Sequence, residues 1–571
     1  MFAIALALLA CAPLLGLSSQ SAPVGTSASA AAVDVHSYHL EVDFSAGLDS
    51  VEIVAVVDLL WRRTLRQLRL DFASPREEGA KDAPAGLSVT SVEISVDGEW
   101  IATRFEHSSD VLTIDLGAEQ AAGGSGRVRV VAAGVPRDGL LLGRNDAGEP
   151  VAFADNWPNR ARHWIPSVDH PSDKALFTFD VEVPDAYRSV AVGELIEERP
   201  LPAARWRTRW RTRAPLATKV ATLGVARFQV RREPSGEVPV AISSWVYSGD
   251  ERALSALAVA PRVLAEMVEM LGPFPYAKLA NVQSTTRYGG MENAGAIFYR
   301  ESALHGDPER VERLVAHEIA HQWFGDAVSE AEWNDVWLSE GFATYLTALF
   351  VERTRGVEAF REVMRSARDR VVAAAHEHPS ATVRPAAVGE DLAGLLGAHT
   401  YQKGAWILHM LRERIGDVAF SEALRGYLEV HRHGNATTAD FFAAVRWARE
   451  RTDLLTDGGR GIESEMRSWL ETPGLPRLEG GWRPTPGGVQ LVIEQTQDGA
   501  LRQLPLEVAV IVSRPEVEDA PFAAGEANRL TVPARRRSEI VIAAPAGEVV
   551  EVRLDPRVRL LFEQGSWQRL P

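Results

Sequence analysis

The sequence predicts an α+β protein of several domains: a β-sandwich-like N-terminal domain, a mainly helical middle domain and a small C-terminal β domain. Its 571 residues exceed the length that a single hydrophobic core usually organises. Apolar and polar residues alternate with a period of two before about residue 235 and again after about residue 476, whereas residues 251–470 have helical spacing. We therefore expect a signal peptide and linker over 1–32, and domains over 33–234, 235–475 and 476–571.

The N-terminal third consists of strand-like segments. In the first of them the apolar residues occupy alternate positions and would share one face of a strand: Tyr38, Leu40, Val42 and Phe44. Similar segments are Val51–Leu60, Leu87–Val96, Val128–Ala133, Phe177–Val183 and Val220–Val230. Gly, Pro and Asp residues separate them, and no long helical pattern precedes residue 235, which favours packed sheets.

The middle block has helical periodicity. Its first helix is expected over Glu251–Leu271, because Gly272 and Pro273 end the pattern. The further expected helices are Pro308–Phe324, Ser339–Arg353, Ala359–His376, Tyr401–Arg414, Phe420–His431, Thr438–Arg451 and Ile462–Leu470. Alternation returns at Val489–Ile493 and Leu506–Val512, which predicts strands of the second β domain.

The composition limits the classes of partner. The net charge is 61 − 77 = −16, whereas surfaces that bind nucleic acid or anionic lipid are basic. We therefore expect neither as a partner. Cys11 is the only cysteine, so an intrachain disulfide is excluded and a zinc site must rest on other ligands.

The first residues suggest export. Phe2–Leu17 is an apolar run, and the Ser/Ala-rich stretch Ser18–Ala32 follows it. A run of this length suits the core of a signal peptide. We expect a bacterial protein that is periplasmic, outer-membrane-anchored or extracellular, without a transmembrane span in the mature chain. Leu8–Cys11 resembles a lipoprotein processing site, so Cys11 is either a lipid anchor or a cysteine removed with a conventional signal peptide.

A pair of histidines lies on one of the expected helices. Asp307 and Pro308 suit the N-cap and the first position of that helix. His317 and His321 are four residues apart, so both imidazoles project from one face at the separation that a zinc ion requires. Glu318 falls near the metal without having to ligate it, and can deprotonate a zinc-bound water.

Glu340 is the expected third ligand. It follows His321 after eighteen intervening residues and lies at the first turn of the next helix. Two histidines with these two acidic residues are expected by chance only about 0.006 times in such a chain. Because two histidines and one glutamate leave a fourth position open for water, they suit a catalytic rather than a structural zinc ion. We predict one Zn²⁺ per chain.

Two further motifs accompany the zinc motif. The first is Gly289-Gly290-Met291-Glu292-Asn293, and the second is Tyr401-Gln402-Lys403-Gly404-Ala405. In order and approximate spacing, the three motifs resemble those of the zinc aminopeptidase family of aminopeptidase N and leukotriene hydrolase, which are gluzincin metallopeptidases. The resemblance covers roughly residues 35–475, and it implies a thermolysin-like fold for the catalytic domain.

The resemblance also implies a role for each matching residue. The glycine-rich segment would be an edge strand along which the substrate backbone lies, and Glu292 would hold the substrate's α-ammonium group. Tyr401 would donate a hydrogen bond to the oxyanion, and Glu318 would be the general base. Tyr288 would build the pocket for the first side chain. The expected substrate-binding residues are Tyr288, Gly289, Gly290, Met291, Glu292 and Asn293.

The sequence departs from the family pattern in the N-terminal domain. Members usually carry a glutamine or glutamate there that helps to bind the substrate's amino group. The corresponding stretch here is Asp155–Asn159, in which Asn156 or Asn159 would have to substitute. A second departure is Asp326, where asparagine is commoner. The β domain after residue 476 is either a wall of the site or a surface for a partner.

These residues predict a zinc aminopeptidase that acts on peptides with a free amino terminus, and so serves proteolysis and peptide catabolism. Two alternatives stay open. A zinc endopeptidase would share the metal site but would not need Glu292. A non-catalytic cell-surface binding protein would carry a vestigial site, although none of the expected ligands is missing from the sequence.

Overall fold

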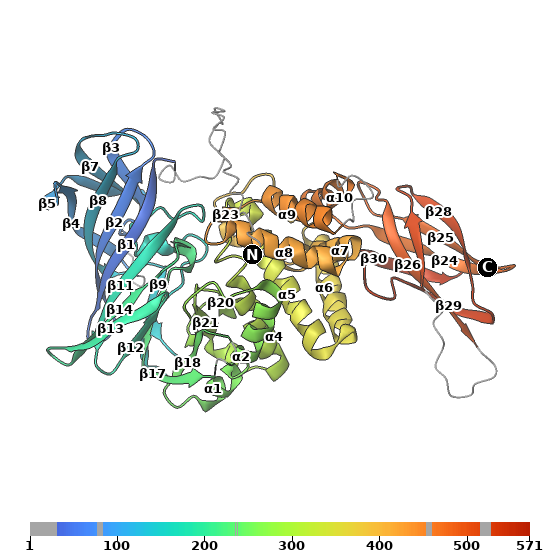
Figure 1. Cartoon of the computed structure of the whole chain (residues 1–571), viewed down its shortest axis with the longest axis horizontal. Coiled ribbons are helices and arrows are strands. Elements are labelled where there is room, and N and C mark those ends of the chain that lie inside the picture. The colour runs from blue at the N-terminus through green and yellow to red at the C-terminus, as the bar shows by residue number, and fades with distance from the viewer. Residues whose placement is uncertain (1–30, 77–83, 235, 237, 453–459, 514–526) are drawn as a thin grey trace, which may run out of the picture.

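The computed structural model describes residues 31–76, 84–234, 236, 238–452, 460–513 and 527–571. The expected signal peptide and Cys11 lie outside these ranges. Within them, no helix is both long and apolar enough to cross a membrane. In Figure 1 an N-terminal β domain, a helical middle part and a C-terminal β domain follow one another along the long axis. The predicted α+β architecture is confirmed, while the domain bounds stay predictions.

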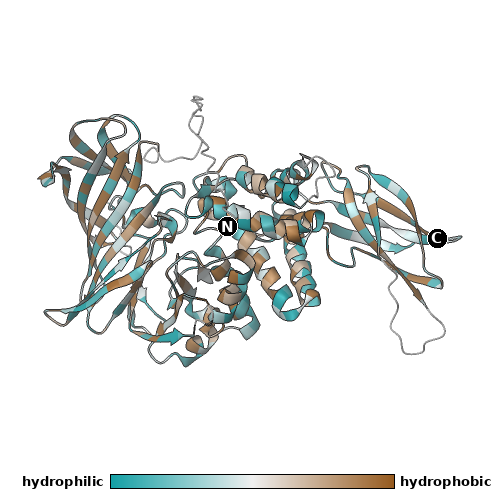
Figure 2. Ribbon diagram, in the orientation of Figure 1, coloured by the Kyte–Doolittle hydropathy of each residue, from teal (hydrophilic) through white to brown (hydrophobic). Residues whose placement is uncertain are grey.

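A nine-stranded sheet forms most of the N-terminal domain. Its strands in spatial order are β13 (Glu194–Leu201), β14 (Arg205–Arg211), β11 (Lys174–Pro184), β1 (Val33–Phe44), β2 (Val51–Trp61), β8 (Ser125–Val135), β4 (Gly86–Val96) and β5 (Glu99–Ala102), with β15 (Leu216–Ala217) beside β11. A smaller sheet contains β3 (Leu65–Asp71), β7 (Val111–Gln120) and β6 (Phe105–Ser108). The alternate residues of β1 are buried as expected: Tyr38, Leu40, Val42 and Phe44. Figure 2 shows this alternation as brown and teal bands along the strands.

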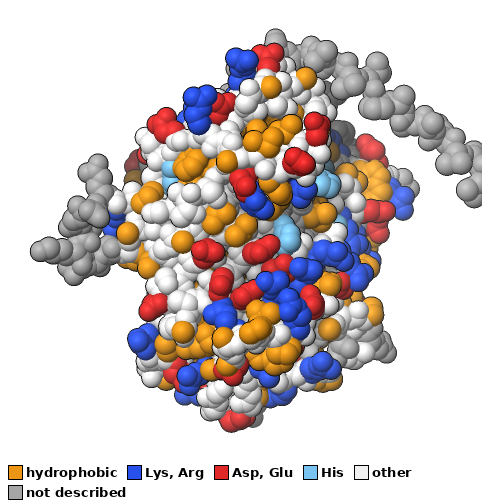
Figure 3. Space-filling model, turned by 90° about the vertical axis from the view of Figure 1, so that its left-hand side faces the viewer, with side chains coloured by type: hydrophobic (Ala, Val, Ile, Leu, Met, Phe, Trp, Pro, Cys, Tyr) orange, Lys and Arg blue, Asp and Glu red, His pale blue; other side chains and the backbone are white. Residues whose placement is uncertain are grey.

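Ion pairs connect neighbouring strands of the large sheet. Arg209 of β14 binds Asp180 of β11 at 2.6 Å, and Arg207 pairs with Glu182 in the same way. Figure 3 views the molecule from the N-terminal domain's end and shows acidic and basic side chains interspersed over it. Such cross-strand pairs favour one register of the strands.

Two more sheets carry the chain into the middle domain. One contains β12 (Arg188–Ala191), β16 (Leu223–Ala226), β10 (Pro150–Ala154) and β9 (Leu140–Arg144), and the other β17 (Phe228–Glu233), β18 (Ala241–Tyr247), β19 (Lys278–Ser284), β21 (Ala296–Arg300) and β20 (Gly290–Met291). The single strand expected over Val220–Val230 is therefore wrong. The chain leaves one sheet after β16 and enters the next at Phe228, so that two short strands of different sheets share one apolar run.

Helices make up most of the middle domain. They are α1 (Glu251–Leu257), α2 (Ala260–Leu271), α3 (Glu301–Leu304), α4 (Pro308–His321), α5 (Trp337–Arg355), α6 (Val357–Glu377), α7 (Gly404–Ile415), α8 (Asp417–His431), α9 (Thr438–Arg451) and α10 (Arg460–Glu471). The helix expected over Glu251–Leu271 is divided in two, because Pro261 lacks the N–H that would bond to the preceding turn. The helix expected over Pro308–Phe324 ends at His321, and the chain then turns toward Gly325, whose φ is +116°.

Two glycines allow α5 and the start of α7 to approach each other. A Cβ on Gly404 would lie only 3.0 Å from the Cα of Gly341, which is closer than nearly all real contacts of this kind. Gly341 directly follows Glu340, and Gly404 follows the π-helical turn His399–Lys403. The close backbone contact therefore sets the separation between Glu340 and Tyr401.

Two sheets form the C-terminal domain. The first contains β28 (Arg537–Ala543), β25 (Gly488–Gln495), β24 (Arg477–Thr485) and β30 (Glu563–Arg569), and the second β27 (Asn528–Val532), β26 (Leu504–Ser513) and β29 (Glu548–Leu554). Arg368 of α6 attaches this domain to the helices. Its guanidinium pairs with the buried carboxylate of Asp555 and lies over the rings of Trp406 and Phe562, at 4.9 and 5.0 Å from their centroids.

We predict that Arg368→Met lowers the free energy of unfolding by about 3 kcal/mol, because it leaves the carboxylate of Asp555 buried without its cation. Arg370→Met, on the exposed side of the same helix, should change it by less than about 0.5 kcal/mol. Urea unfolding followed by fluorescence measures both. Equal effects of the two substitutions would show that the ion pair does not anchor the C-terminal domain.

Candidate active site

The two histidines lie on the last turn and a half of α4. Asp307 accepts a hydrogen bond from the N–H of Arg310 at 3.1 Å and so caps the helix start. The Nε2 atoms of His317 and His321 are 3.1 Å apart. Nδ1 of His321 lies 3.0 Å from the carbonyl oxygen of Phe324, which can only accept, so Nδ1 carries the proton. The lone pair on Nε2 is thereby free for a metal ion.

Glu340 brings a carboxylate to both imidazoles. It lies in the first turn of α5, and its Oε2 is 3.5 Å from Nε2 of His317 and 3.3 Å from Nε2 of His321. Ser339, one residue earlier, lies 3.1 Å from Nδ1 of His321 through its hydroxyl. The predicted ligand atoms therefore converge within 4.8 Å of one another, from helices that the chain joins through a separate loop.

The charges of this cluster fit a divalent cation. Glu292, Glu318 and Glu340 are each 4% exposed. Although burial favours the neutral imidazole, the carboxylates of Glu340 and Glu292 raise the pKa of His321 to about 10. Without a metal ion, the cluster thus takes up a proton to compensate its buried negative charge. His317, His321 and Glu340 are the ligand types that zinc prefers.

Glu292 lies at the end of the edge strand β20, which pairs with β21 on one side. Gln322 holds this segment against α4: its side chain accepts from the N–H of Gly295 at 2.7 Å and donates to the carbonyl of Glu292 at 2.6 Å. Oε1 of Glu292 is buried and has no hydrogen-bond partner among the described residues. Its carboxylate, that of Glu318 and the ring of His321 lie within 4.8 Å of one another. The carboxylate of Glu292 can therefore bind a cationic group of a ligand.

Glu318 lies directly beneath the edge strand. A Cβ on Gly290 would fall 2.3 Å from its Oε1, so a larger residue at that position would displace the carboxylate of Glu318. Burial raises the pKa of the Glu318 carboxyl well above its usual range, which makes it a stronger base than an exposed glutamate.

Tyr288 and Tyr401 line the same pocket as the predicted zinc ligands. The ring of Tyr401 stacks on His317, with centroids 5.9 Å apart and planes at 15°. Burial raises the pKa of Tyr401, so the phenol stays protonated and can donate. Tyr288 packs edge to face against Trp157 at 6.2 Å, and its N–H is 3.5 Å from the hydroxyl oxygen of Thr286.

Neither asparagine offered as a substitute reaches this pocket with a free group. Asn156 is completely buried, and its amide donates to the carbonyls of Thr218 and Ala221 and accepts from Trp164. That suggestion is wrong for Asn156, because its hydrogen-bonding groups are all engaged. Asn159 lines a different pocket.

The pocket also contains residues that the sequence did not single out. Trp157, from the departing stretch, and Leu396 line it beside Tyr288. Asp326 lies outside it, where it accepts a hydrogen bond from Gln322 at 2.9 Å. The spacing of His317, His321 and Glu340 in the sequence indicated the zinc ligands. No local pattern of this kind marks Leu396 as part of the site.

Comparison with known proteins places this geometry in a family. Residues 256–469 match the model of the peptidase family M1 domain. These residues form an M1 domain. All three motifs lie inside it, so the resemblance to the family of aminopeptidase N is confirmed.

Relatives of the M1 domain are found among curated proteins. A probable aminopeptidase 2 of Sulfurisphaera tokodaii is 28% identical over 55% of this chain and 40% of its own length. A glutamyl aminopeptidase of Bos taurus is 28% identical over 57% of this chain and 35% of its own length. The chain thus matches less than half of the length of these relatives.

A solved structure extends the likeness beyond the M1 domain. The M1 zinc metallopeptidase of Deinococcus radiodurans superposes with a TM-score of 0.63 at 25% identity, over 79% of this chain and 96% of that one. The likeness therefore covers more of the fold than the M1 domain alone, and the similar protein is described as a zinc metallopeptidase.

We predict that Glu340→Gln lowers the affinity for zinc by at least about 100-fold, since the substitution removes a charged ligand, and even the groups that only orient ligands contribute about 10- to 100-fold. Glu358→Gln, on the exposed start of α6, should leave it unchanged. Competition with a colorimetric chelator measures the affinity. Equal affinities of both variants would exclude Glu340 as a ligand.

Proposed function

We propose that this protein is a zinc-dependent aminopeptidase, which hydrolyses the N-terminal peptide bond of peptides. The observation that carries the proposal is the position of Glu292. Its buried carboxylate lies in the same cluster as the imidazole of His321 and the carboxylate of Glu318. A carboxylate there pairs with the ammonium group of a free amino terminus, and so fixes how far the cleaved bond lies from the start of the substrate.

His317, His321 and Glu340 would hold the zinc ion. When bound, zinc lowers the pKa of a water molecule and polarises the scissile carbonyl group. Three protein ligands are the number found in catalytic zinc sites, which keep one position for water or substrate. The names of the solved M1 structures, zinc metallopeptidases, support this choice of metal.

The remaining residues bind the substrate and move its protons. Among the described residues β20 is the outermost strand of its sheet, so its outer edge can pair with an extended peptide, as in other complexes of sheet edges. Glu318 accepts the proton of the attacking water at its carboxylate and gives it to the leaving amine nitrogen. Tyr401 donates its phenolic hydrogen to the oxygen that becomes negatively charged.

The two other functions account for less of the structure. In an endopeptidase, Glu292 would stay buried without a cationic partner, at a cost in stability. In a non-catalytic binding protein, the raised pKa of Glu318 and the placement of Tyr401 in the same pocket would have no role. Two of the curated relatives are named as aminopeptidases, and this also favours the proposed function.

We expect Glu318→Gln to lower kcat by about 10²- to 10⁴-fold, because the amide cannot take up the proton. The zinc content should stay the same, since Glu318 is not a ligand. Glu309→Gln, exposed on the first turn of α4, serves as the control and should keep full activity. Turnover of leucine amides and metal analysis measure the two quantities. Full activity of Glu318→Gln would refute its role as the base.

Glu292→Gln should lower kcat/KM for peptides with a free amino terminus by at least about 30-fold, as expected when a buried charge pair loses one member. Its zinc content should be unaffected. The wild-type protein should not cleave the same peptides after N-acetylation. Comparable cleavage of acetylated and free peptides by the wild type would favour an endopeptidase instead.

A further inference from the structure

The pocket beside the predicted zinc ligands has an apolar side that takes no part in the proposed chemistry. Trp157, Tyr288, Met291 and Leu396 line it next to Glu292. The rings of Trp157 and Tyr288 meet edge to face, with centroids 6.2 Å apart and planes at 87°. Apart from the phenol of Tyr288 and the indole N–H of Trp157, these side chains offer a substrate only apolar contact. Since they adjoin the carboxylate for the amino group, the first side chain of a substrate is the part that reaches them.

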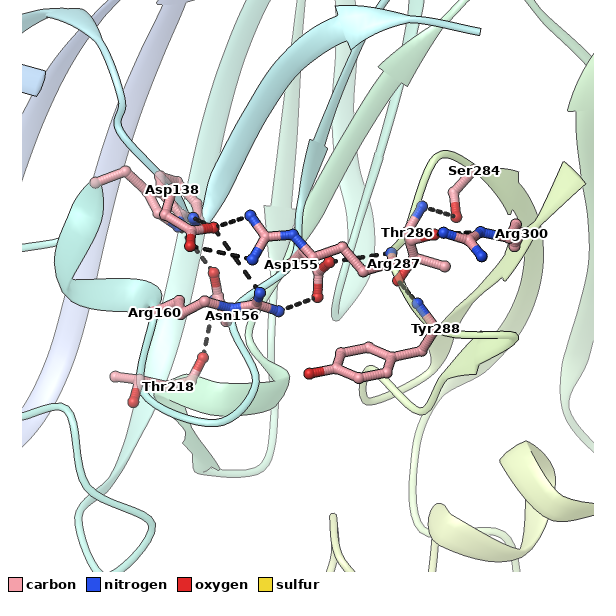
Figure 4. A network of polar contacts seen from close by, with 12 residues as sticks. Asp138, Asp155, Asn156, Arg160, Thr218, Ser284, Thr286, Arg287, Tyr288 and Arg300 are labelled. Atoms are coloured by element: carbon pink, nitrogen blue, oxygen red, sulfur yellow. Dashed lines mark hydrogen bonds and ion pairs between the residues drawn. The ribbon is translucent and has the colours of Figure 1, made fainter. Parts of the chain in front are cut away.

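The charges behind this apolar side are already paired. Arg160 donates to Asp155 at 2.7 Å, and Arg287 binds Asp138 with both terminal nitrogens. Figure 4 shows this network alongside Tyr288. The guanidinium of Arg160 also lies 5.9 Å from the centroid of the Tyr288 ring. Two arginines and two aspartates balance one another, so this network leaves no net charge for a substrate side chain.

A first side chain with either a negative or a positive charge would therefore be disfavoured. An acidic one would approach the carboxylates of Glu292 and Glu318 in the same pocket. A basic one would find no free counter-charge in this network, because Asp155 and Asp138 are already paired with Arg160 and Arg287. The carboxylates of the cluster do not compensate a basic side chain, because the proposed chemistry uses them for the metal ion, the amino group and the proton. Loss of hydration without a counter-charge is costly for both.

We infer that the pocket selects peptides whose first residue carries an uncharged, apolar side chain. Trp157 and Leu396, together with Tyr288, determine this specificity. The inference rests on the proposed aminopeptidase function and states its substrate class. The departing stretch of the N-terminal domain thereby has a role of its own, because Trp157 supplies apolar contact to the pocket.

The wild-type full-length protein, loaded with zinc, tests the inference on fluorogenic amides of single amino acids. We expect kcat/KM for the leucyl, methionyl and phenylalanyl amides to exceed that for the glutamyl and lysyl amides by about 100-fold or more. A glutamyl or lysyl amide within threefold of the leucyl amide would overturn the inference while supporting the aminopeptidase function. Inactivity toward every amide, with zinc bound, would instead contradict the function and with it the inference.

Two opposite substitutions of Leu396 identify the determinant. Leu396→Glu should raise the lysyl-to-leucyl ratio of kcat/KM at least tenfold, and Leu396→Lys should raise the glutamyl-to-leucyl ratio by a similar factor. Leu195→Glu, on the exposed strand β13 and 44% exposed, should alter neither ratio. Trp157→Phe, which keeps an aromatic ring, should change the phenylalanyl-to-leucyl ratio severalfold. Ratios equal to wild type in both Leu396 variants and in Trp157→Phe would overturn the assignment of these two residues.

Discussion

The burial of three carboxylates beside two imidazoles is the constraint on which the rest of the structure depends. Glu292, Glu318 and Glu340 are nearly inaccessible, and each buried anion costs several kcal/mol unless a positive charge compensates it. The carboxylates of Glu340 and Glu292 raise the pKa of His321, so the cluster favours added positive charge. A divalent metal ion and the ammonium group of a substrate provide positive charges at two positions, whereas a proton provides only one.

The backbone around the cluster is arranged to bring these carboxylates together. Gly341 and Gly404 allow α5 to lie against the turn that carries Tyr401. Gly290 leaves room for the carboxylate of Glu318 beneath the edge strand, and Gln322 bonds that strand to α4. The glycines of the three motifs are thus packing requirements of the site as much as binding residues. A side chain at any of the three positions would separate groups that the chemistry needs within one side chain's reach.

The sequence alone allowed good prediction where the signals were local. Helices with clear end signals, such as Pro308 at a start and Gly272 at a stop, occur close to the expected residues. The spacing of His317 and His321 sufficed to place two ring nitrogens together, since one helix carries both. The run Val220–Val230 was misread because alternation does not reveal when a chain passes from one sheet into another.

The parts of the site that escaped prediction depend on contacts between distant segments. The hydrogen bond from His321 to the carbonyl of Phe324 follows from where α4 ends, and that end lies three residues before the expected one. Trp157 and Leu396 meet at the pocket although they lie 239 positions apart in the sequence. Asn156 has a polar side chain of the expected kind, but hydrogen bonds within the N-terminal domain already occupy its amide group.

The most direct measurement is anomalous diffraction at the zinc edge, from crystals grown with zinc and an amino acid amide that resists hydrolysis. The account predicts one peak at about 2.0–2.3 Å from His317, His321 and Glu340, with the amino group of the ligand on the carboxylate of Glu292. A zinc peak away from these three side chains, or a ligand whose amino group lies outside the reach of Glu292, would contradict it.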